Sequence, residues 1–389
     1  MRFLVGRDAF ADALAAAVKI LPARSPVPIF ETVLLSVEGD RLTITSTNME
    51  ISLRQRLGVA EAQEGALAVP GKLLHNTVQS LKGPSLHFEL KGTNLHLKHD
   101  TGKYRFAGFD ASGFPKIRNV PDTQSTVIAL RELKQGTSAV SFCAAKEDPR
   151  AFLTGVLWEI RPEEMRFVAS DSQRLGFWRI AASFENELNA IVSRTGVDVM
   201  RNLPGEEIKV MVDQDQEFLF VVYDQGELIT RLIPGPYAPY EAVIPESEGS
   251  VLKVETQEML SAVRRLVDFT EAPTHIMRMK LTASGCQLEA HSAGGSAEES
   301  VSGEYSGQEM LMGVSGRMLL DVLKAVPSQT TLLRFYGTGS PIRIEPETMD
   351  PGFELLYLIM PIKLEDEFAE NEETPQPDSQ EDDLEDVDF

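Results

Sequence analysis

Residues 81–83 read Leu81-Lys82-Gly83, and they end a helix-like stretch whose rhythm returns twice further along the chain. The same place is taken by Leu203-Pro204-Gly205 and then by Val326-Pro327-Ser328, at intervals of 122 and 123 residues. This period is too long for a solenoid unit of roughly 20–50 residues, and it suits an independent domain with its own core. The chain is therefore predicted to contain three copies of one domain.

A strand followed by a turn repeats with the same period. The stretch Ile44-Thr45-Ser46-Thr47-Asn48 matches Phe167-Val168-Ala169-Ser170-Asp171 and then Leu288-Glu289-Ala290-His291-Ser292, at intervals of 123 and 121 residues. The length of 389 residues agrees with several domains of ordinary size. We expect domains at 1–122, 123–248 and 249–364, followed by a separate tail at 365–389.

Each repeat alternates between helical and strand-like periodicity. The first helices are expected near 7–20, 130–146 and 256–268, where apolar residues recur at helical spacing, as in Leu260, Val263 and Val267. The second set is expected near 71–82, 194–203 and 315–326. Between the helices the apolar period falls to two, as in residues 86–90 and 95–97. This predicts an α+β fold in which two helices pack on antiparallel sheet.

The composition is that of an ordinary soluble protein, with 42% hydrophobic and 25% charged residues. No apolar stretch is long enough to span a membrane, and residues 1–8 lack the apolar core of a signal peptide. Cys143 and Cys286 fall in different repeats, so neither a disulfide nor a cysteine metal site is expected. Buried thiols in a reducing, cytoplasmic protein are the expectation.

The negative charge is concentrated at one end of the chain. The net charge is −22, and residues 365–389 contain 13 Asp or Glu and no Lys or Arg. Residues 1–364 therefore carry only −9. A segment of this composition cannot build a core, and we expect an acidic, disordered tail.

Positive charge gathers on the predicted helices. Those six segments hold 13 Lys or Arg against 7 Asp or Glu, which leaves −15 for the rest of residues 1–364. A basic surface made by helices can then coexist with an acidic exterior made by sheets and loops. The plainer alternative is that each amphipathic helix simply exposes a charged face to water.

A search for catalytic or cofactor chemistry finds little. His96 and His99 lie three apart on strand-like sequence, hence on opposite faces, so shared metal binding is not expected. The glycine pairs Gly294-Gly295 and Gly337-Thr338-Gly339 lack what phosphate binding needs and are expected to be turns. Within Ser170-Asp171-Ser172, a loop aspartate that caps backbone amides is favoured over a nucleophile. No catalytic residue, metal or cofactor is predicted.

Four further motifs carry a family resemblance. They are Arg24-Ser25-Pro26-Val27-Pro28-Ile29, Ala169-Ser170-Asp171-Ser172-Gln173-Arg174-Leu175, Pro239-Tyr240-Glu241-Ala242-Val243-Ile244-Pro245 and Leu358-Ile359-Met360-Pro361-Ile362-Lys363-Leu364. In this order, on a threefold repeat, they resemble the bacterial sliding clamp family, the beta subunit of DNA polymerase III. The resemblance spans residues 1–364 and implies a head-to-tail homodimer of six clamp domains that closes a ring. Such a ring encircles duplex DNA without sequence specificity and tethers the replicative polymerase, and it is not itself an enzyme.

The resemblance also implies partners and DNA contacts. The partners expected are the replicative DNA polymerase, the clamp loader, translesion polymerases, ligase and mismatch-repair proteins, which bind through linear peptide motifs in the cytoplasm, at the nucleoid. The residues expected to face DNA are Arg24, Lys72, Lys146, Arg150, Arg194, Arg201, Arg317 and Lys324. Lys72 stands where arginine is common in the family, so it keeps the charge but loses the guanidinium fork.

A peptide pocket between the second and third domains follows from the same resemblance. Its expected members are Leu153, Ser170, Ser172, Gln173, Arg174, Leu175, Val243, Pro341, Met360, Pro361 and Ile362. An apolar floor with a flexible methionine suits leucine and phenylalanine anchors from many partners. Gln173, Ala238 and Ala242 depart from the family pattern, and they are expected to alter which peptides bind.

The dimer interface is expected at Phe106 of one copy and at Leu266 and Phe269 of the other. The tail carries Gln380, Leu384 and Phe389 in the order of the Gln-x-x-Leu-x-Phe peptide that the resemblance implies for partners, but with wider spacing. It either solubilises the protein, docks in the peptide pocket of its own or a neighbouring ring, or competes with DNA for the basic lining. Two rival functions remain: a multidomain hydrolase built around Asp171, and a monomeric scaffold.

Overall fold

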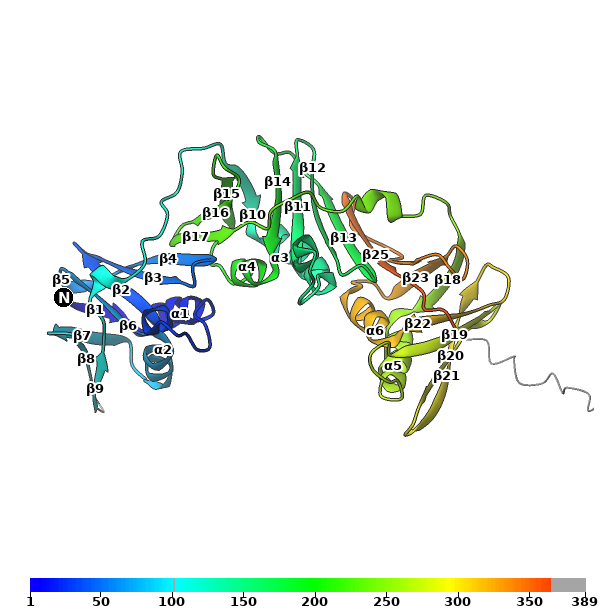
Figure 1. The fold of residues 1–389 in the computed structure, drawn as a ribbon, viewed down its shortest axis with the longest axis horizontal. Helices are drawn as coiled ribbons and strands as arrows, with labels where there is room; N and C mark the ends of the chain where they lie inside the picture. The colour runs from blue at the N-terminus through cyan, green and yellow to red at the C-terminus, as the bar shows by residue number, and fades with distance from the viewer. Residues whose placement is uncertain (101, 365–389) are drawn as a thin grey trace, which may run out of the picture.

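The computed structural model describes residues 1–100 and 102–364. The chain forms an arc whose helices lie along the concave side, while the sheets form the convex side and both ends (Figure 1). The tail expected at 365–389 lies outside the described residues. Three successive groups of elements follow one order: a strand, a helix, four strands, a second helix and three strands, with one extra short strand in the first group.

The elements of the first repeat are β1 (Arg2–Gly6), α1 (Arg7–Val18), η1 (Pro28–Glu31), β2 (Thr32–Glu38), β3 (Arg41–Thr47), β4 (Ile51–Gly58), β5 (Ala60–Gln63), β6 (Gly65–Pro70), α2 (Gly71–Ser80), β7 (Ser85–Lys91), β8 (Asn94–His99), β9 (Gly102–Ala107) and η2 (Ala111–Gly113). Its core is a cluster in which Phe3 stacks on Phe88 with ring centroids 4.9 Å apart, and Phe10 of α1 meets Phe88 edge-on. Helix and sheet thus bury their apolar faces against each other.

The second repeat comprises β10 (Thr126–Ala129), α3 (Leu130–Val140), η3 (Ser141–Cys143), η4 (Ala151–Thr154), β11 (Gly155–Arg161), β12 (Glu164–Ser170), β13 (Arg174–Ala181), β14 (Leu188–Ser193), α4 (Arg194–Met200), β15 (Glu207–Val212), β16 (Phe218–Tyr223), β17 (Gly226–Arg231) and η5 (Tyr240–Val243). Its sheet buries Trp158, Phe167 and Trp178 beneath α3. Gly136 of α3 has no side chain because Phe167 and Trp178 fill that space.

The third repeat comprises β18 (Ser250–Glu255), α5 (Thr256–Val267), β19 (Ile276–Thr282), β20 (Gly285–Ser292), β21 (Gly295–Tyr305), β22 (Met310–Ser315), α6 (Gly316–Ala325), β23 (Thr330–Phe335), β24 (Ile342–Pro346) and β25 (Phe353–Ile359). Met259, Leu260, Val263 and Leu266 of α5 recur at helical spacing and are buried. The carboxylate of Glu255 accepts the amide of Glu258 and caps this helix.

The three repeats share their sheets. Strand β4 of the first repeat pairs with β17 of the second, from Ile51 opposite Thr230 to Gln55 opposite Gly226. Strand β13 of the second pairs with β25 of the third over seven residue pairs. The result is an 8-stranded sheet across the first junction and a 12-stranded sheet across the second, beside a 5-stranded sheet in the first repeat.

The predicted α+β class and all six helices are confirmed. Each predicted start lies within one residue of the observed one, whereas α3 ends at Val140 rather than near 146. The apolar pattern continues beyond Val140 because the tighter turn η3 also turns Cys143 into the core. None of the helices in the described part of the chain is long and apolar enough to cross a membrane.

Candidate functional site

A depression of about 260 Å³ lies where the second and third repeats meet. The ladder between β13 and β25 builds its floor by placing Leu175 opposite Leu358. Residues at Arg150–Leu153 and at Tyr237–Val243 form the walls. Side chains more than 180 residues apart in the sequence therefore meet through strand pairing.

The floor is apolar because β13 and β25 are covered on both faces. Leu175, Phe177, Leu356 and Leu358 point away from the main core and form a second cluster with Tyr240. Strands buried on both faces carry continuous apolar runs instead of alternation. At the mouth, the side chains of Val243 and Met360 remain 54% and 39% exposed, so apolar surface is open to a ligand.

The loop after β12 forms the polar rim. Asp171 Oδ1 accepts the amides of Gln173 (3.0 Å) and Arg174 (2.9 Å), and Ser170 Oγ donates to the Arg174 carbonyl at 2.8 Å. This confirms the expected role of Asp171 as a cap of backbone amides. The turn is tight enough to hold Ser172 at a φ of 72°.

Arg166 holds the second wall, η5, in place. Its guanidinium donates to Tyr240 Oη at 3.2 Å and to Glu241 Oε1 at 2.6 Å. Tyr240 in turn donates to Glu159 Oε2 at 2.5 Å. Burial and the Glu159 carboxylate raise the pKa of Tyr240 well above its usual value, so the phenol stays neutral and keeps donating.

Arg174 connects the two repeats beneath the rim. Its Nη1 donates to Asp321 Oδ2 of α6 at 3.0 Å, its Nε to Asp171 Oδ2 at 3.0 Å, and its Nη2 to the Phe142 carbonyl at 2.8 Å. The side chain is mostly buried, and three acceptors use its planar fork. Arg174 therefore fixes the rim of the depression against a helix of the next repeat.

The lining includes nine of the eleven predicted pocket residues. Pro361 and Ile362 do not line it, and Ile362 donates its amide to the Gly313 carbonyl at 2.9 Å. Of the other seven lining residues, the prediction assigned Arg150 to DNA and expected Ala238 only to alter which peptides bind. Its list of pocket members did not include Phe152, Tyr237, Pro239, Tyr240 and Leu358. The unbroken apolar run from Leu355 to Met360 was a readable signal that both faces of this strand are covered.

A second, larger cleft of about 910 Å³ opens on the helix side of the same junction. Its lining carries five basic residues, Lys134, Lys146, Arg174, Arg194 and Lys324. Asp321 is its one acidic residue within the described chain, and Asp321 is bonded to Arg174. Three of the predicted DNA-facing residues, Lys146, Arg194 and Lys324, are thus brought together in a basic cleft.

The other predicted DNA-facing residues are spread over the chain. Lys72, in the first turn of α2, donates to the carbonyls of Pro22 (2.9 Å) and Ala23 (3.3 Å), beside the exposed Arg24. Arg317 is the second residue of α6, and Arg201 follows the last residue of α4.

Arg150 lies on the rim of the apolar pocket. It bonds to Asp148 Oδ1 at 3.0 Å and to Ser172 Oγ at 3.3 Å. Its place among the pocket residues differs from that of Lys146, four residues earlier, which lies in the basic cleft.

The three predicted interface residues differ in exposure. Leu266 is fully buried in its own core and Phe106 is 2% exposed, so neither offers its side chain to a second copy. Phe269 is 36% exposed and lies beside Gly295, at the start of β21. Among the described residues, no group of three or more His, Cys, Asp or Glu could hold a metal ion.

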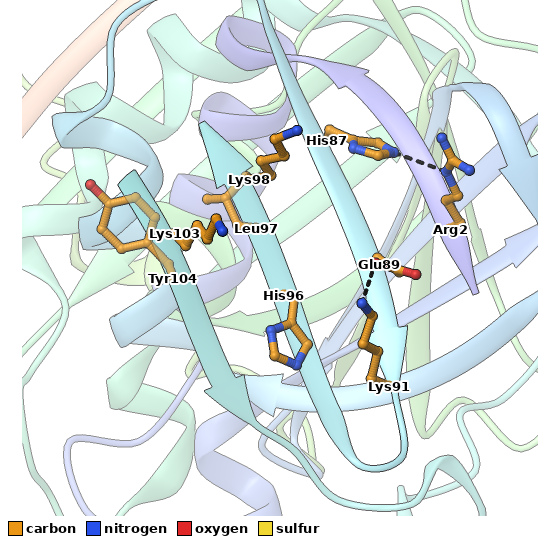
Figure 2. A pocket seen from close by; sticks show the side chains of 9 residues that line it. All are labelled: Arg2, His87, Glu89, Lys91, His96, Leu97, Lys98, Lys103 and Tyr104. Carbon is orange, nitrogen blue, oxygen red and sulfur yellow. Dashed lines mark hydrogen bonds and ion pairs between the residues drawn. The ribbon is translucent and has the colours of Figure 1, made fainter. Parts of the chain in front are cut away.

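The sequence predicted an acidic exterior, but the outer sheet of the first repeat carries mainly basic and histidine side chains. Strands β1, β7, β8 and β9 place basic and histidine side chains around a depression of about 420 Å³ (Figure 2). We call this surface the outer basic face; it comprises Arg2, His87, Lys91, His96, Lys98 and Lys103. Their neighbours in sequence, such as Phe88 and Leu95, point to the core, so strand alternation selects this set.

Comparison with known proteins gives one consistent family. Models of the N-terminal, central and C-terminal domains of the DNA polymerase III beta subunit match residues 1–118, 127–239 and 241–363. The beta sliding clamps of Pseudomonas putida and Escherichia coli are each 26% identical, and the alignments cover 94% of this chain and 100% of theirs.

Solved structures share the fold. The DNA polymerase III beta subunit of Pseudomonas aeruginosa superposes with a TM-score of 0.86 at 24% identity, and that of Thermotoga maritima with 0.87 at 23%. Each comparison covers 94% of this chain and 100% of the other.

Proposed function

This chain belongs to the DNA polymerase III beta subunit family, and on that premise we propose that it is a DNA sliding clamp. Two copies close a ring around duplex DNA, hold the replicative polymerase on its template, and catalyse no reaction themselves. The three clamp domains are assigned to residues 1–122, 123–248 and 249–364. The observation that carries the proposal is the match of three successive domain models within residues 1–363, together with an arc whose concave side bears the helices.

The strand pairing supports a head-to-tail ring. At both internal junctions, the strand equivalent to β4 in one repeat pairs with the strand equivalent to β9 in the next. Among the described residues, β9 has one free edge, and the first part of β21, the β4 equivalent of the third repeat, has another. Edge strands need partners, and pairing β9 of one copy with β21 of the other satisfies both edges and closes the ring.

Basic residues of the helix side face the DNA. Lys146, Arg194 and Lys324 attract the phosphate backbone, and such contacts carry no sequence information. A modest positive lining suffices, because the closed ring itself keeps the clamp on the duplex. Arg24 and Lys72 extend the lining into the first repeat.

The apolar pocket recruits the partners. It takes a short peptide with leucine and phenylalanine anchors, because its floor is apolar and Met360 can adapt to different sequences. The replicative polymerase and the clamp loader use it, as do translesion polymerases, ligase and mismatch-repair proteins. Arg150, Ser172 and Gln173 on the rim select among these peptides.

Topological retention is the decisive test. The protein is loaded on nicked circular DNA with a clamp loader, separated by gel filtration at high salt, and then treated with a restriction enzyme. A sliding clamp stays on the circle and leaves when the DNA is linearised. Release from intact circles, or equal retention on linear DNA, would overturn the proposal.

The DNA lining can be tested in the same assay. Replacing Lys146 and Lys324 by glutamate should reduce the loaded fraction several-fold, with the largest effect at low salt. The control is Lys209→Glu, an exposed lysine on β15 that follows the buried Ile208 and so lies on the other face of the strand. An equal loss in the control would mean that overall charge, not the lining, is responsible.

The pocket is tested with a fluorescent peptide that carries the pattern Gln-x-x-Leu-x-Phe, which the family resemblance implies for partner peptides. Met360→Ala and Val243→Ala should each weaken its binding by about tenfold, since burying such a side chain is worth roughly 1.5–3 kcal/mol. Leu311→Ala, also an exposed apolar residue, 47% exposed on β22, is the control. Unchanged affinity in both pocket variants would remove the pocket from the proposal.

A further inference from the structure

The outer basic face lies outside the DNA lining and the peptide pocket, and it contains an unfavourable arrangement. Lys98 of β8 stands directly opposite Lys103 of β9. Like charges set directly across a strand pair destabilise the sheet. Nothing in the fold of the first repeat requires lysines at these exposed positions.

Acidic neighbours neutralise only part of this face. Arg2 pairs with Glu61 at 3.0 Å and Lys91 pairs with Glu89 at 2.9 Å. Within residues 1–100 and 102–364, no ion pair is found for Lys98, Lys103 or Arg105. The unpaired cations therefore gather on β8 and β9, next to the free edge that the ring seam uses.

The equivalent strands of the third repeat also set two cations opposite each other, but there an acidic residue pairs with both. Arg334 of β23 and Arg343 of β24 also stand opposite each other. There Glu345 accepts from both, at 2.6 Å from Arg334 and 2.8 Å from Arg343. The first repeat lacks such an internal acid, so the structure leaves its cations available to an external one.

The chain itself contains a matching acidic segment. Residues 365–389 carry 13 Asp or Glu and no Lys or Arg, and they follow directly on Leu364. We propose that the acidic segment 365–389 of one copy docks on the outer basic face of the other copy and so clasps the seam of the ring. This rests on the head-to-tail ring of the proposed function.

The distances agree with this docking. Ile362 bonds to Gly313 at the outer edge of β22, and strands β22, β19, β20 and β21 then lead to the seam. At about 4.8 Å per strand, Lys103 and Lys98 of the second copy lie roughly 25–30 Å from Ile362. A segment of 25 residues spans at most roughly 80 Å, which is ample.

The same segment cannot reach its own copy's outer basic face so directly. Strand β9 and the third repeat stand at opposite ends of the arc (Figure 1). In a head-to-tail ring, by contrast, β9 of the neighbour adjoins β21. Docking therefore connects two copies and adds to the stability of the dimer, with a strength that falls as salt rises.

Zero-length carbodiimide cross-linking tests the contact directly, because it couples carboxylates only to amines in contact and the acidic segment has no lysine. Full-length protein at low salt should yield cross-linked peptides joining 365–389 to Lys98 or Lys103. Mixing a 15N-labelled copy that carries Lys98→Gln and Lys103→Gln with an unlabelled 1–364 copy should still give the link, now between copies. Links only to Lys146 or Lys324, or none, would overturn the proposal.

A dimer dissociation measurement supplies the energetic test. Removing residues 365–389, or making Lys98→Gln and Lys103→Gln together, should each raise the dimer Kd about tenfold at 50 mM salt and little at 500 mM. The two changes combined should equal either one alone, since they remove the same contact. The matched control is Lys209→Gln. Additive effects, or an unchanged Kd on truncation, would refute the clasp while leaving the ring intact, whereas a full-length monomer would refute the ring itself.

Discussion

At the scale of single residues, Arg174 is a side chain that links the second repeat to the third. It lines both the apolar pocket and the basic cleft, and its three hydrogen bonds join the rim loop, η3 and α6. A planar, forked donor is required for this, because lysine offers a single ammonium and cannot reach three acceptors in different directions. Arg174 thus positions the rim of the pocket that we propose for peptide binding.

Arg174→Lys should lower the affinity for the Gln-x-x-Leu-x-Phe peptide about tenfold, and Asp321→Asn should lower it less, since it removes only one of the three bonds. Fluorescence anisotropy measures both, and circular dichroism shows whether the fold survives. Peptide affinity equal to wild type in Arg174→Lys would show that the rim holds its shape without the fork.

The two thiols should be chemically silent in the native protein. Burial raises the pKa of Cys286 to about 12 and that of Cys143 further still. Below those values the reactive thiolate is scarce, and access is blocked as well. Ellman's reagent at pH 8 should label neither cysteine in folded protein and both in guanidinium. Rapid native labelling of one thiol would contradict the packing around it.

At the scale of elements, the helices follow from the sequence better than the pocket does. Apolar spacing predicts where α5 and α6 begin, because each helix must bury one stripe on the sheet. The apolar spacing does not predict that α3 ends at Val140. It shows which residues are buried, but it does not show where the α-helical hydrogen bonds give way to the 3-10 turn η3. Leu175 and Leu358 are adjacent only through strand pairing, so local pattern cannot join them. The family resemblance placed Leu175 and Met360 in one pocket but did not include Leu358.

Gly136 makes the close packing of α3 on its sheet testable. A methyl group at this position would lie 2.4 Å from Phe167 and 2.5 Å from Trp178, both fully packed. Gly136→Ala should therefore destabilise the protein by about 1–3 kcal/mol despite the better helix propensity of alanine. Gly58→Ala, with open space around it, is the control. Chemical denaturation measures both, and a stabilised Gly136→Ala would show that α3 can shift.

At the scale of the whole molecule, one chain forms half of a closed ring. Each internal junction joins one repeat to the next by a strand ladder, and the two unmatched edges lie at the two ends of the arc. The threefold period already predicted the repeats. Which edges stay open, however, depends on the pairing of β21 with β18 and β20, and this became visible only in the structure.

Phe269 should control the assembly. It is the one exposed member of the three predicted interface residues, and it lies beside the start of β21. Phe269→Asp should shift the light-scattering mass from twice the 43.0 kDa chain toward a single chain. Leu311→Asp serves as control. A stable dimer in Phe269→Asp would place the seam elsewhere.

The ladders inside each chain also determine how the ring responds to force. Bending the arc at the second junction would require the seven residue pairs between β13 and β25 to separate, with Trp178 packed against Phe353 behind them. Each chain therefore moves as one rigid body. A force that opens the ring then acts mainly on the seam between the two copies.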